Sequence, residues 1–214
     1  MTNPYYSDEW VTLYHGDCLQ ITDWLAADVL VTDPPYGMAY DSGWVKGRST
    51  VIAGDGDTAI REKVLDLWLP RPALVFGTWR QPRPINARHV LIWDKGDDPG
   101  TGDLSMPWGN SHEEIYVFGQ GFTGKRGPAV LRCAKPPVND RDAHPTPKPL
   151  ALMDSLIAKC PPGVIADPFA GSGSTLVAAK ALGRHAIGVE LEERYCEIAA
   201  RRLAQDVLDF GSAS

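Results

Sequence analysis

Seven short apolar segments, each bounded by turn-forming residues, constrain this sequence more than any other feature. Several carry apolar residues at consecutive positions, which is typical of strands covered on both faces of a sheet. Four segments with helical periodicity alternate with them or follow them, which predicts a three-layer α/β fold with helices on both faces of a mostly parallel sheet. The expected strands are 11–17, 28–33, 73–77, 89–94, 114–119, 163–169 and 185–191, and the expected helices are 59–69, 148–160, 174–183 and 192–208.

The length and composition of the chain predict one globular domain over residues 1–214. Its formal net charge is −6, so contact with a nucleic acid would require a local basic face. The four cysteines are scattered without paired spacing, which predicts reduced thiols in an intracellular protein. We expect neither a signal peptide nor a membrane helix, because no apolar run approaches the roughly 18 residues that a membrane helix needs.

A glycine-bearing loop follows the expected strand that ends at Asp167. The loop Gly171-Ser172-Gly173 leads into an expected helix, and the next strand ends at Glu190, 19 residues after Gly171. Glycines allow close approach of the backbone to a ligand, and an acidic residue at the next strand tip can accept hydrogen bonds from ribose hydroxyls. The alternative is a tight turn that packs helix on strand. Leu176 stands where a dinucleotide site has its third glycine, which favours a nucleoside cofactor without a pyrophosphate.

A second strand tip carries the sequence Asp33-Pro34-Pro35-Tyr36. The exocyclic amine of a nucleobase is a poor nucleophile, and methylating it requires acceptors that hold its N–H groups as the nitrogen becomes tetrahedral. The Asp33 carboxylate is one such acceptor, and a main-chain carbonyl held still by the prolines is another. Tyr36 offers a flat face on which an extruded base can stack. The alternative is an Asx-Pro turn that closes the strand.

The segments "DPPYG" and "DPFAGSGST" together resemble the motifs of the DNA amino-methyltransferases that use S-adenosylmethionine (SAM). The catalytic motif comes first and the cofactor motif later, which resembles the circularly permuted β class of that family. The segments "LYHGDCLQ", "IWDKG", "SHEEIYVFG" and "HPTPKPLALMDSLI" also resemble this class, so the similarity runs from about residue 11 to 203. The resemblance implies a Rossmann-like methyltransferase fold, SAM as cofactor, no metal, and methyl transfer to a base flipped out of double-stranded DNA.

The resemblance also assigns roles to individual residues. It implies catalytic roles for Asp33, Pro34, Pro35 and Tyr36. It implies cofactor binding by Asp17, Cys18, Asp33, His144, Thr146, Lys148, Asp167, Phe169, Gly171, Ser172, Gly173, Thr175 and Glu190. Because the catalytic motif begins with aspartate, where serine is commoner among cytosine-N4 enzymes, it favours adenine N6 as the target atom.

Three other functions stay open at this point. An RNA or protein N-methyltransferase would use a similar acceptor tip, although it usually begins with asparagine and follows the glycine loop. A decayed, non-enzymatic DNA-binding protein on the same scaffold is the second alternative. A nicotinamide-linked enzyme is the third, and Leu176 disfavours it.

Basic and aromatic side chains in loop-like sequence are candidates for DNA contact, with a solvated surface as the alternative for each group. Many enzymes of the β class carry a long target-recognition region before the "HPTPKP" motif, and this chain departs from that pattern, with only short candidate loops at about 37–57, 95–111 and 120–143. This departure predicts a short recognition site or a homodimer that shares the recognition, and a cognate restriction enzyme is a further candidate partner. The resemblance also predicts the bacterial cytoplasm as location, for a bacterial or phage-encoded protein. The DNA-contact candidates are Tyr40, Trp44, Lys46, Arg48, Arg80, Arg83, Lys125 and Arg126, with Arg88, Arg132, Lys135 and Arg141 in the same clusters.

Several other side chains receive structural interpretations. Glu113 and Glu114 are expected to be solvated or structural. Trp93 and Trp108 are expected in the core rather than stacked on bases. Asp17 is also a candidate N-cap for a helix over the following residues.

Overall fold

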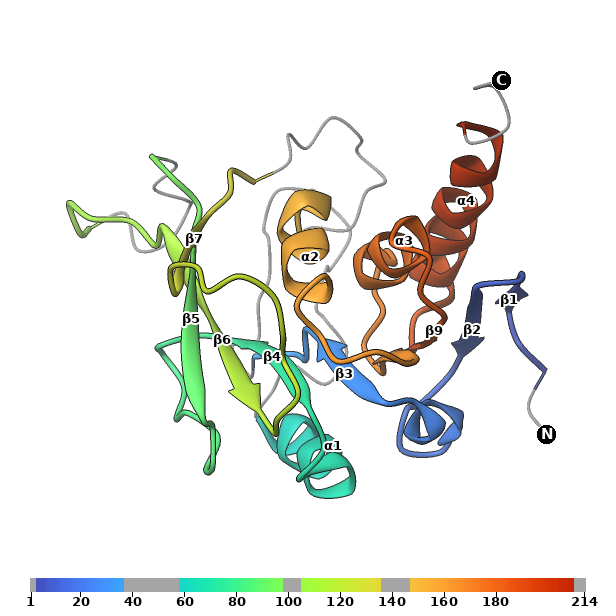
Figure 1. The fold of residues 1–214 in the computed structure, drawn as a ribbon, viewed down its shortest axis with the longest axis horizontal. Helices are drawn as coiled ribbons and strands as arrows, with labels where there is room; N and C mark the ends of the chain where they lie inside the picture. The colour runs from blue at the N-terminus through green and yellow to red at the C-terminus, as the bar shows by residue number, and fades with distance from the viewer. Residues whose placement is uncertain (1–2, 37–57, 98–104, 136–146, 210–214) are drawn as a thin grey trace.

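A single nine-stranded mixed sheet organises the chain (Figure 1). The computed structural model describes residues 3–36, 58–97, 105–135 and 147–209. The strands follow the order β1-β2-β9-β8-β3-β4-β6-β5-β7 across the sheet. Their bounds are β1 Tyr6–Ser7, β2 Val11–His15, β3 Val29–Thr32, β4 Ala73–Gly77, β5 His89–Asp94, β6 His112–Phe118, β7 Val130–Arg132, β8 Ile165–Asp167 and β9 Ala186–Glu190.

The five strands β2, β9, β8, β3 and β4 are mutually parallel and form the centre of the sheet. The strand β6 pairs antiparallel with β4, and β5 pairs antiparallel with β6. All seven expected strands are therefore confirmed, within a few residues at their ends. The sequence prediction missed β1 and β7, which have two and three residues and are too short to show an apolar pattern.

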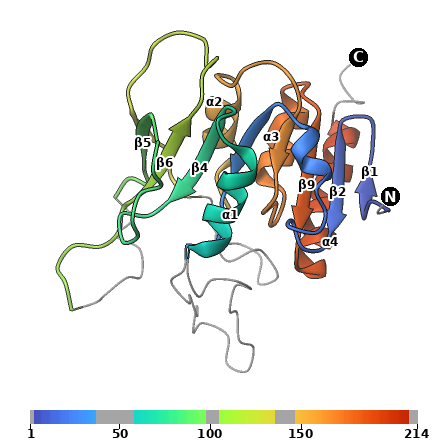
Figure 2. The same ribbon diagram turned by 90° about the horizontal axis from the view of Figure 1, so that it is seen from below.

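Helices cover both faces of the sheet, which confirms the three-layer prediction (Figures 1 and 2). The helices α2, α3 and α4 lie on one face, and their apolar side chains share a core with Val29, Val31 and Phe76. The helix α1 and the short 3-10 helix η1 lie on the other face, where Trp24 stacks on Trp68 with ring centroids 5.8 Å apart. The bounds are η1 Asp23–Ala26, α1 Ala59–Trp68, α2 Leu150–Ile157, α3 Ser174–Ala181 and α4 Glu193–Asp209.

The segment after Asp17 forms a turn rather than the expected helix. The Asp17 carboxylate accepts a hydrogen bond from the Leu19 backbone N–H at 2.9 Å, and helical geometry appears only in η1. Asp17 therefore closes a turn locally, and the N-cap interpretation is wrong. Among the helices that the structure describes, none is both long and apolar enough to span a bilayer.

The parallel pairing at the centre of the sheet decides where ligands can bind. The strands β3, β8 and β9 lie side by side and run in the same direction, so their carboxyl ends meet at one edge. In open α/β sheets ligands bind outside this edge, where the connecting loops begin. The tips identified in the sequence, after Thr32, Asp167 and Glu190, all leave the sheet there.

Gly77, at the end of β4, provides a test of the packing at this edge. A Cβ atom at position 77 would lie 2.4 Å from Cε2 of the fully buried Tyr116 ring. We expect Gly77→Ala to lower the free energy of unfolding by about 1 to 3 kcal/mol, because a packed ring cannot move away. Gly127→Ala is the matched control, since a Cβ there meets nothing within 4 Å. Urea unfolding followed by tryptophan fluorescence measures both, and equal stability of the two variants would contradict the packing argument.

Candidate active site

The two strand tips singled out in the sequence adjoin each other. The Thr32 hydroxyl, at the end of β3, donates a buried 2.7 Å hydrogen bond to Oδ1 of Asp167, at the end of β8. The hydrogen bond places the acceptor tip and the start of the glycine loop next to each other, as a transfer between two ligands requires.

A side-chain hydrogen bond and two left-handed glycines give the loop after β8 its shape. Asp167 Oδ1 also accepts from the Phe169 N–H at 3.1 Å, which turns the chain out of β8. Gly171 and Gly173 have φ angles of +52° and +81°, in the left-handed region that favours glycine. A Cβ at Gly173 would lie 2.9 Å from Cβ of Ala199 on α4, so this glycine is required for helix packing. The tight-turn interpretation thus accounts for Gly173.

Glu190 joins the glycine loop to the tip of β9. Its Oε2 accepts from the Gly171 N–H at 2.7 Å, and its Oε1 accepts from the Glu192 N–H at 2.8 Å. Each carboxylate oxygen has capacity for a second hydrogen bond, so the group can still accept from a pair of vicinal hydroxyls. The hydrogen-bond acceptors of the Glu190 carboxylate therefore fit the hydroxyls of a ribose in a nucleoside cofactor.

Two buried carboxyl groups beside this loop have raised pKa values. Burial raises the pKa of Asp167 to about 6, although hydrogen bonds from Thr175 and Thr32 oppose the shift. Burial also raises the pKa of Glu190, against the two backbone N–H groups that stabilise its charged form. Buried carboxyl groups with shifted pKa values are typical of functional sites.

Asp33 lies at the centre of a dense polar network. Its Oδ2 pairs with the ammonium of Lys148, in the segment that leads into α2. Its Oδ1 accepts from the Tyr36 hydroxyl at 2.6 Å. The Asp33 side chain is 26% exposed and that of Lys148 is 7% exposed. Burial raises the pKa of Asp33, and the neighbouring Lys148 charge opposes the rise.

Glu113 belongs to the same network, so of its two interpretations, solvated or structural, the solvated one is wrong. The Tyr36 hydroxyl lies 2.9 Å from Glu113 Oε2, and Lys148 Nζ lies 3.3 Å from the same oxygen. Lys95 Nζ lies 2.5 Å from Oε1. The Glu113 carboxylate thus lies against two lysines, one from the segment after β5 and one from the segment before α2. The sequence signal was limited to two adjacent glutamates on a strand.

Glu114 faces the opposite side of β6, because successive strand residues alternate. It accepts from Arg83 at 2.6 Å and from the Tyr116 hydroxyl at 2.9 Å, and it is buried. The structural interpretation of Glu114 is confirmed. Arg83, a candidate for DNA contact, is therefore already engaged in an ion pair, with its side chain still 61% exposed.

The remaining predicted cofactor residues lie close to the same edge. Asp17 and Cys18 follow β2, beside β9, where the Gly16 N–H donates to the Glu190 carbonyl at 2.8 Å. Ser172 is buried, and its carbonyl accepts from Arg202 at 2.7 Å. His144 and Thr146 lie outside the described residues, as do Tyr40, Trp44, Lys46, Arg48 and Arg141.

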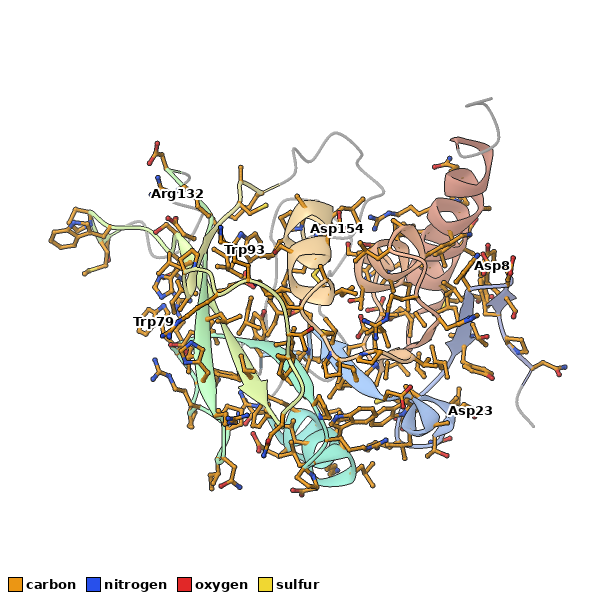
Figure 3. All side chains as sticks on the ribbon, viewed as in Figure 1. Asp8, Asp23, Trp79, Trp93, Arg132 and Asp154 are labelled. Atoms are coloured by element: carbon orange, nitrogen blue, oxygen red, sulfur yellow. The ribbon has the colours of Figure 1, made fainter. Side chains whose placement is uncertain are left out.

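The described candidates for DNA contact are exposed, except for the partly buried Lys135. The Trp79 side chain is 55% exposed at the edge of the molecule (Figure 3). The Arg80 guanidinium lies 5.5 Å from the centroid of the Trp79 ring. Arg88, Lys125 and Arg126 are exposed as well. Trp93 lies in the core between the strands and α2, as expected (Figure 3). Trp108 is 79% exposed, so its assignment to the core is wrong.

Known proteins resemble this chain over most of its length. Residues 62–201 match the family model for DNA methylases of the N6/N4 type. The putative methylase YubD of Escherichia coli (strain K12) is 31% identical, covering 93% of each chain. The type II methyltransferase M.ScaI of Streptomyces caespitosus is 26% identical, covering 94% of this chain and 83% of that protein.

Solved structures share the fold. The M1.HpyAVI–SAM complex superposes with a TM-score of 0.68 at 24% identity, covering 90% of this chain and 98% of that one. The cytosine-N4-specific PvuII DNA methyltransferase superposes with a TM-score of 0.70 at 16% identity, covering 97% and 93%. These similarities extend across the sheet and the helices on both of its faces, and so support the Rossmann-like prediction.

The buried charge of Asp167 makes stability depend on pH. With a folded-state pKa of about 6, above the ordinary value of 3.8, the native state binds the proton more tightly than the unfolded state. The contribution of Asp167 to stability therefore falls as the pH rises from about 4 to about 6. We expect the melting temperature of Asp167→Asn, relative to the wild type, to rise across this window and level off above it. A difference that is constant from pH 4.5 to 8 in thermal denaturation would contradict the assignment.

Proposed function

Because this chain belongs to the N6/N4 family of DNA methylases, we propose that it methylates the N6 amino group of adenine in double-stranded DNA. The family assignment makes it a DNA amino-methyltransferase, with SAM as the methyl donor. The choice of adenine and the roles of individual residues are our proposal. The observation that carries it is the adjacency of the Asp33 tip and the glycine loop, joined by the Thr32–Asp167 hydrogen bond.

Asp33 and its neighbours form the acceptor side of the reaction. An amino group of a flipped base would donate one N–H to the Asp33 carboxylate and the other to a backbone carbonyl of the proline pair. The ring of Tyr36 would stack on the base. These contacts hold the nitrogen lone pair towards the methyl donor and stabilise positive charge on the nitrogen until a proton leaves.

The glycine loop and its neighbours form the donor side. Bound SAM would supply an electrophilic methyl group, with its sulfonium sulfur as the leaving group. Glu190 would accept hydrogen bonds from the ribose hydroxyls, and Phe169 would pack beside the cofactor. Asp17 would face the adenosine moiety. The backbone of Gly171 and Ser172 would lie against the cofactor.

The identity of the target base rests on the first residue of the acceptor tip. Asp33 favours adenine N6 by the family resemblance. Cytosine N4 is the second candidate, because the PvuII enzyme, named as cytosine-N4-specific, shares the fold at a TM-score of 0.70. Modification-sensitive single-molecule sequencing of plasmid DNA from expressing cells would report base, atom and site together. N4-methylcytosine in place of N6-methyladenine would overturn the adenine assignment.

The DNA is proposed to approach over the loop that follows β4. Because β4 is parallel to β3, Trp79 and Arg80 leave the sheet at the same edge as Asp33. An exposed aromatic ring beside an arginine can contact both bases and phosphates. We further propose that the chain forms a single domain with short recognition loops. A homodimer, a cognate restriction enzyme and a location in the bacterial cytoplasm are parts of the same proposal.

Two variants separate the donor side from the acceptor side. We expect Asp33→Ala to bind SAM with wild-type affinity and to lose methyl transfer by about 100-fold or more, because it removes an acceptor needed in the transition state. We expect Glu190→Gln to weaken SAM binding by about tenfold, since it removes charge from the ribose acceptor. Isothermal titration and a tritiated-SAM assay measure the two effects. Retained transfer by Asp33→Ala would refute the catalytic assignment.

The Arg80 proposal predicts a salt-dependent change. Arg80→Ala should weaken DNA binding at all sequences and reduce the slope of log affinity against log salt by about one, because one phosphate contact is lost. Arg201→Ala is the matched control, since Arg201 is 65% exposed on α4. Fluorescence anisotropy with a labelled duplex at several salt concentrations gives both slopes. Identical slopes for the two variants would exclude Arg80 from the interface.

A further inference from the structure

The two side chains that occupy the Asp33 carboxylate share a second acceptor. Tyr36 donates to Oδ1 of Asp33 and Lys148 pairs with Oδ2, so an amino group that reaches either oxygen has to share it with a donor already bound there. The same two donors lie 2.9 Å and 3.3 Å from a single atom, Oε2 of Glu113. We propose that Glu113 is a positioning residue that takes over the Tyr36 hydroxyl and the Lys148 ammonium when Asp33 binds the amino group of the substrate.

The charges around Asp33 balance. Two carboxylates, from Asp33 and Glu113, face two ammonium groups, from Lys95 and Lys148, and the side chains of both lysines and of Glu113 are no more than 14% exposed. A lysine displaced from Asp33 with no other partner would leave an uncompensated charge in a nearly dry site, which is strongly unfavourable. Glu113 already lies within ion-pair distance of Lys148, so the displaced ammonium keeps a partner.

Lys95 keeps Glu113 available for this exchange. It pairs with Oε1, the oxygen that faces neither Tyr36 nor Lys148, and its ammonium lies 4.9 Å from the ring centroid of Trp93. Lys148 and Lys95 together hold the pKa of Glu113 at about 2, against the effect of burial. Glu113 therefore stays charged over the working pH range, with Oε2 directed at the two donors.

The Tyr36 hydroxyl has one proton and two carboxylates within reach. Both neighbouring carboxylates and burial raise its pKa well above the ordinary value, so the phenol stays protonated. Its single proton serves one carboxylate at a time, and a small rotation of the hydroxyl transfers the hydrogen bond from Asp33 to Glu113. The Tyr36 ring, the proposed stacking face, does not need to move for this exchange.

The exchange rests on the proposed role of Asp33 as acceptor for the amino group. It adds the requirement that Glu113 receives the two donors that leave Asp33. The Asp33 side chain, at 26%, is more exposed than those of Glu113, Lys148 and Lys95, so a substrate would reach it before Glu113. Without Lys148 and Tyr36 the Asp33 carboxylate is a stronger acceptor for an N–H group and for positive charge on the nitrogen. Glu113 would thus act on the reaction only through Asp33, Tyr36 and Lys148.

Glu113→Gln is the test, and Glu114→Gln is its matched control. Both replace an ion-paired glutamate of β6 whose side chain is no more than 14% exposed, and the two glutamates lie on opposite faces of the sheet. With enzyme in excess over unmethylated plasmid DNA and saturating tritiated SAM, we expect Glu113→Gln to lower the single-turnover rate about tenfold or more. We expect Glu114→Gln to lower the melting temperature and to keep the rate within about twofold of the wild type. SAM affinity should be unchanged in both.

The pH profile separates this role from a structural one. The titratable groups that face Asp33 are Lys148, Tyr36, Glu113 and Asp167, with Lys95 behind Glu113. The Glu113 charge raises the pKa of Asp33, so Glu113→Gln lowers that pKa and moves the acid limb of the rate to lower pH. A variant that only perturbs folding would lower the plateau and leave the limb in place.

Glu113→Asp completes the design, because it keeps the charge and withdraws the carboxylate from both donors. We expect a reduced rate with an unmoved acid limb. It also serves if Glu113→Gln does not fold, as judged by circular dichroism and SAM titration. Wild-type rates in both Glu113 variants would overturn the exchange, as would a Glu113→Gln pH profile equal to that of Glu114→Gln. Failure of the wild-type enzyme to methylate any DNA would instead overturn the proposed function.

Discussion

The parallel pairing of β3 with β8 is the constraint on which the site depends. It brings the ends of two segments about 135 residues apart into register, and the Thr32–Asp167 hydrogen bond closes them together. Without it, an acceptor tip and a cofactor loop would be two unrelated turns. The packing on both faces of the sheet holds this pair, since Val29, Leu30, Val31 and Ile165 are fully buried.

The arrangement concentrates negative charge at one edge and compensates it unevenly. Asp33 and Glu113 face two lysines, so their charges balance. Asp167 and Glu190 have only neutral donors among the partners that the structure describes, and burial raises the pKa of each. Asp167 and Glu190, which accept from hydroxyl and backbone N–H groups, suit a site that binds neutral hydroxyls. The ion-paired Asp33 would instead be released from its donors by exchange with Glu113. The two halves of the edge thus differ in chemistry as they do in proposed role.

Much of the fold follows from local sequence. The central strands β3, β4 and β8 carry continuous apolar runs because they are buried on both faces, and all seven expected strands, parallel and antiparallel, were recognisable from their apolar residues. Both tips were visible because each is a contiguous motif at a strand end. What could not be predicted depends on long-range contacts. The position of Glu113 beside Tyr36 joins residues 77 apart in the sequence, and the exposure of Trp108 depends on where a loop lies. Even Gly173, correctly singled out, is explained by Ala199 on α4.

The spatial order of the strands explains why the order of motifs along the chain is immaterial to the chemistry. A site at the edge of a parallel sheet requires only that β9, β8 and β3 be neighbours with the same direction, and pairing satisfies this whichever strand comes first in the sequence. The acceptor tip precedes the cofactor loop here, yet the two tips are adjacent. What the chain order does decide is which segments cross the site. Lys148 enters it from the segment that leads into α2, between the two motifs, and so carries a charge to Asp33 and Glu113 that neither motif contains.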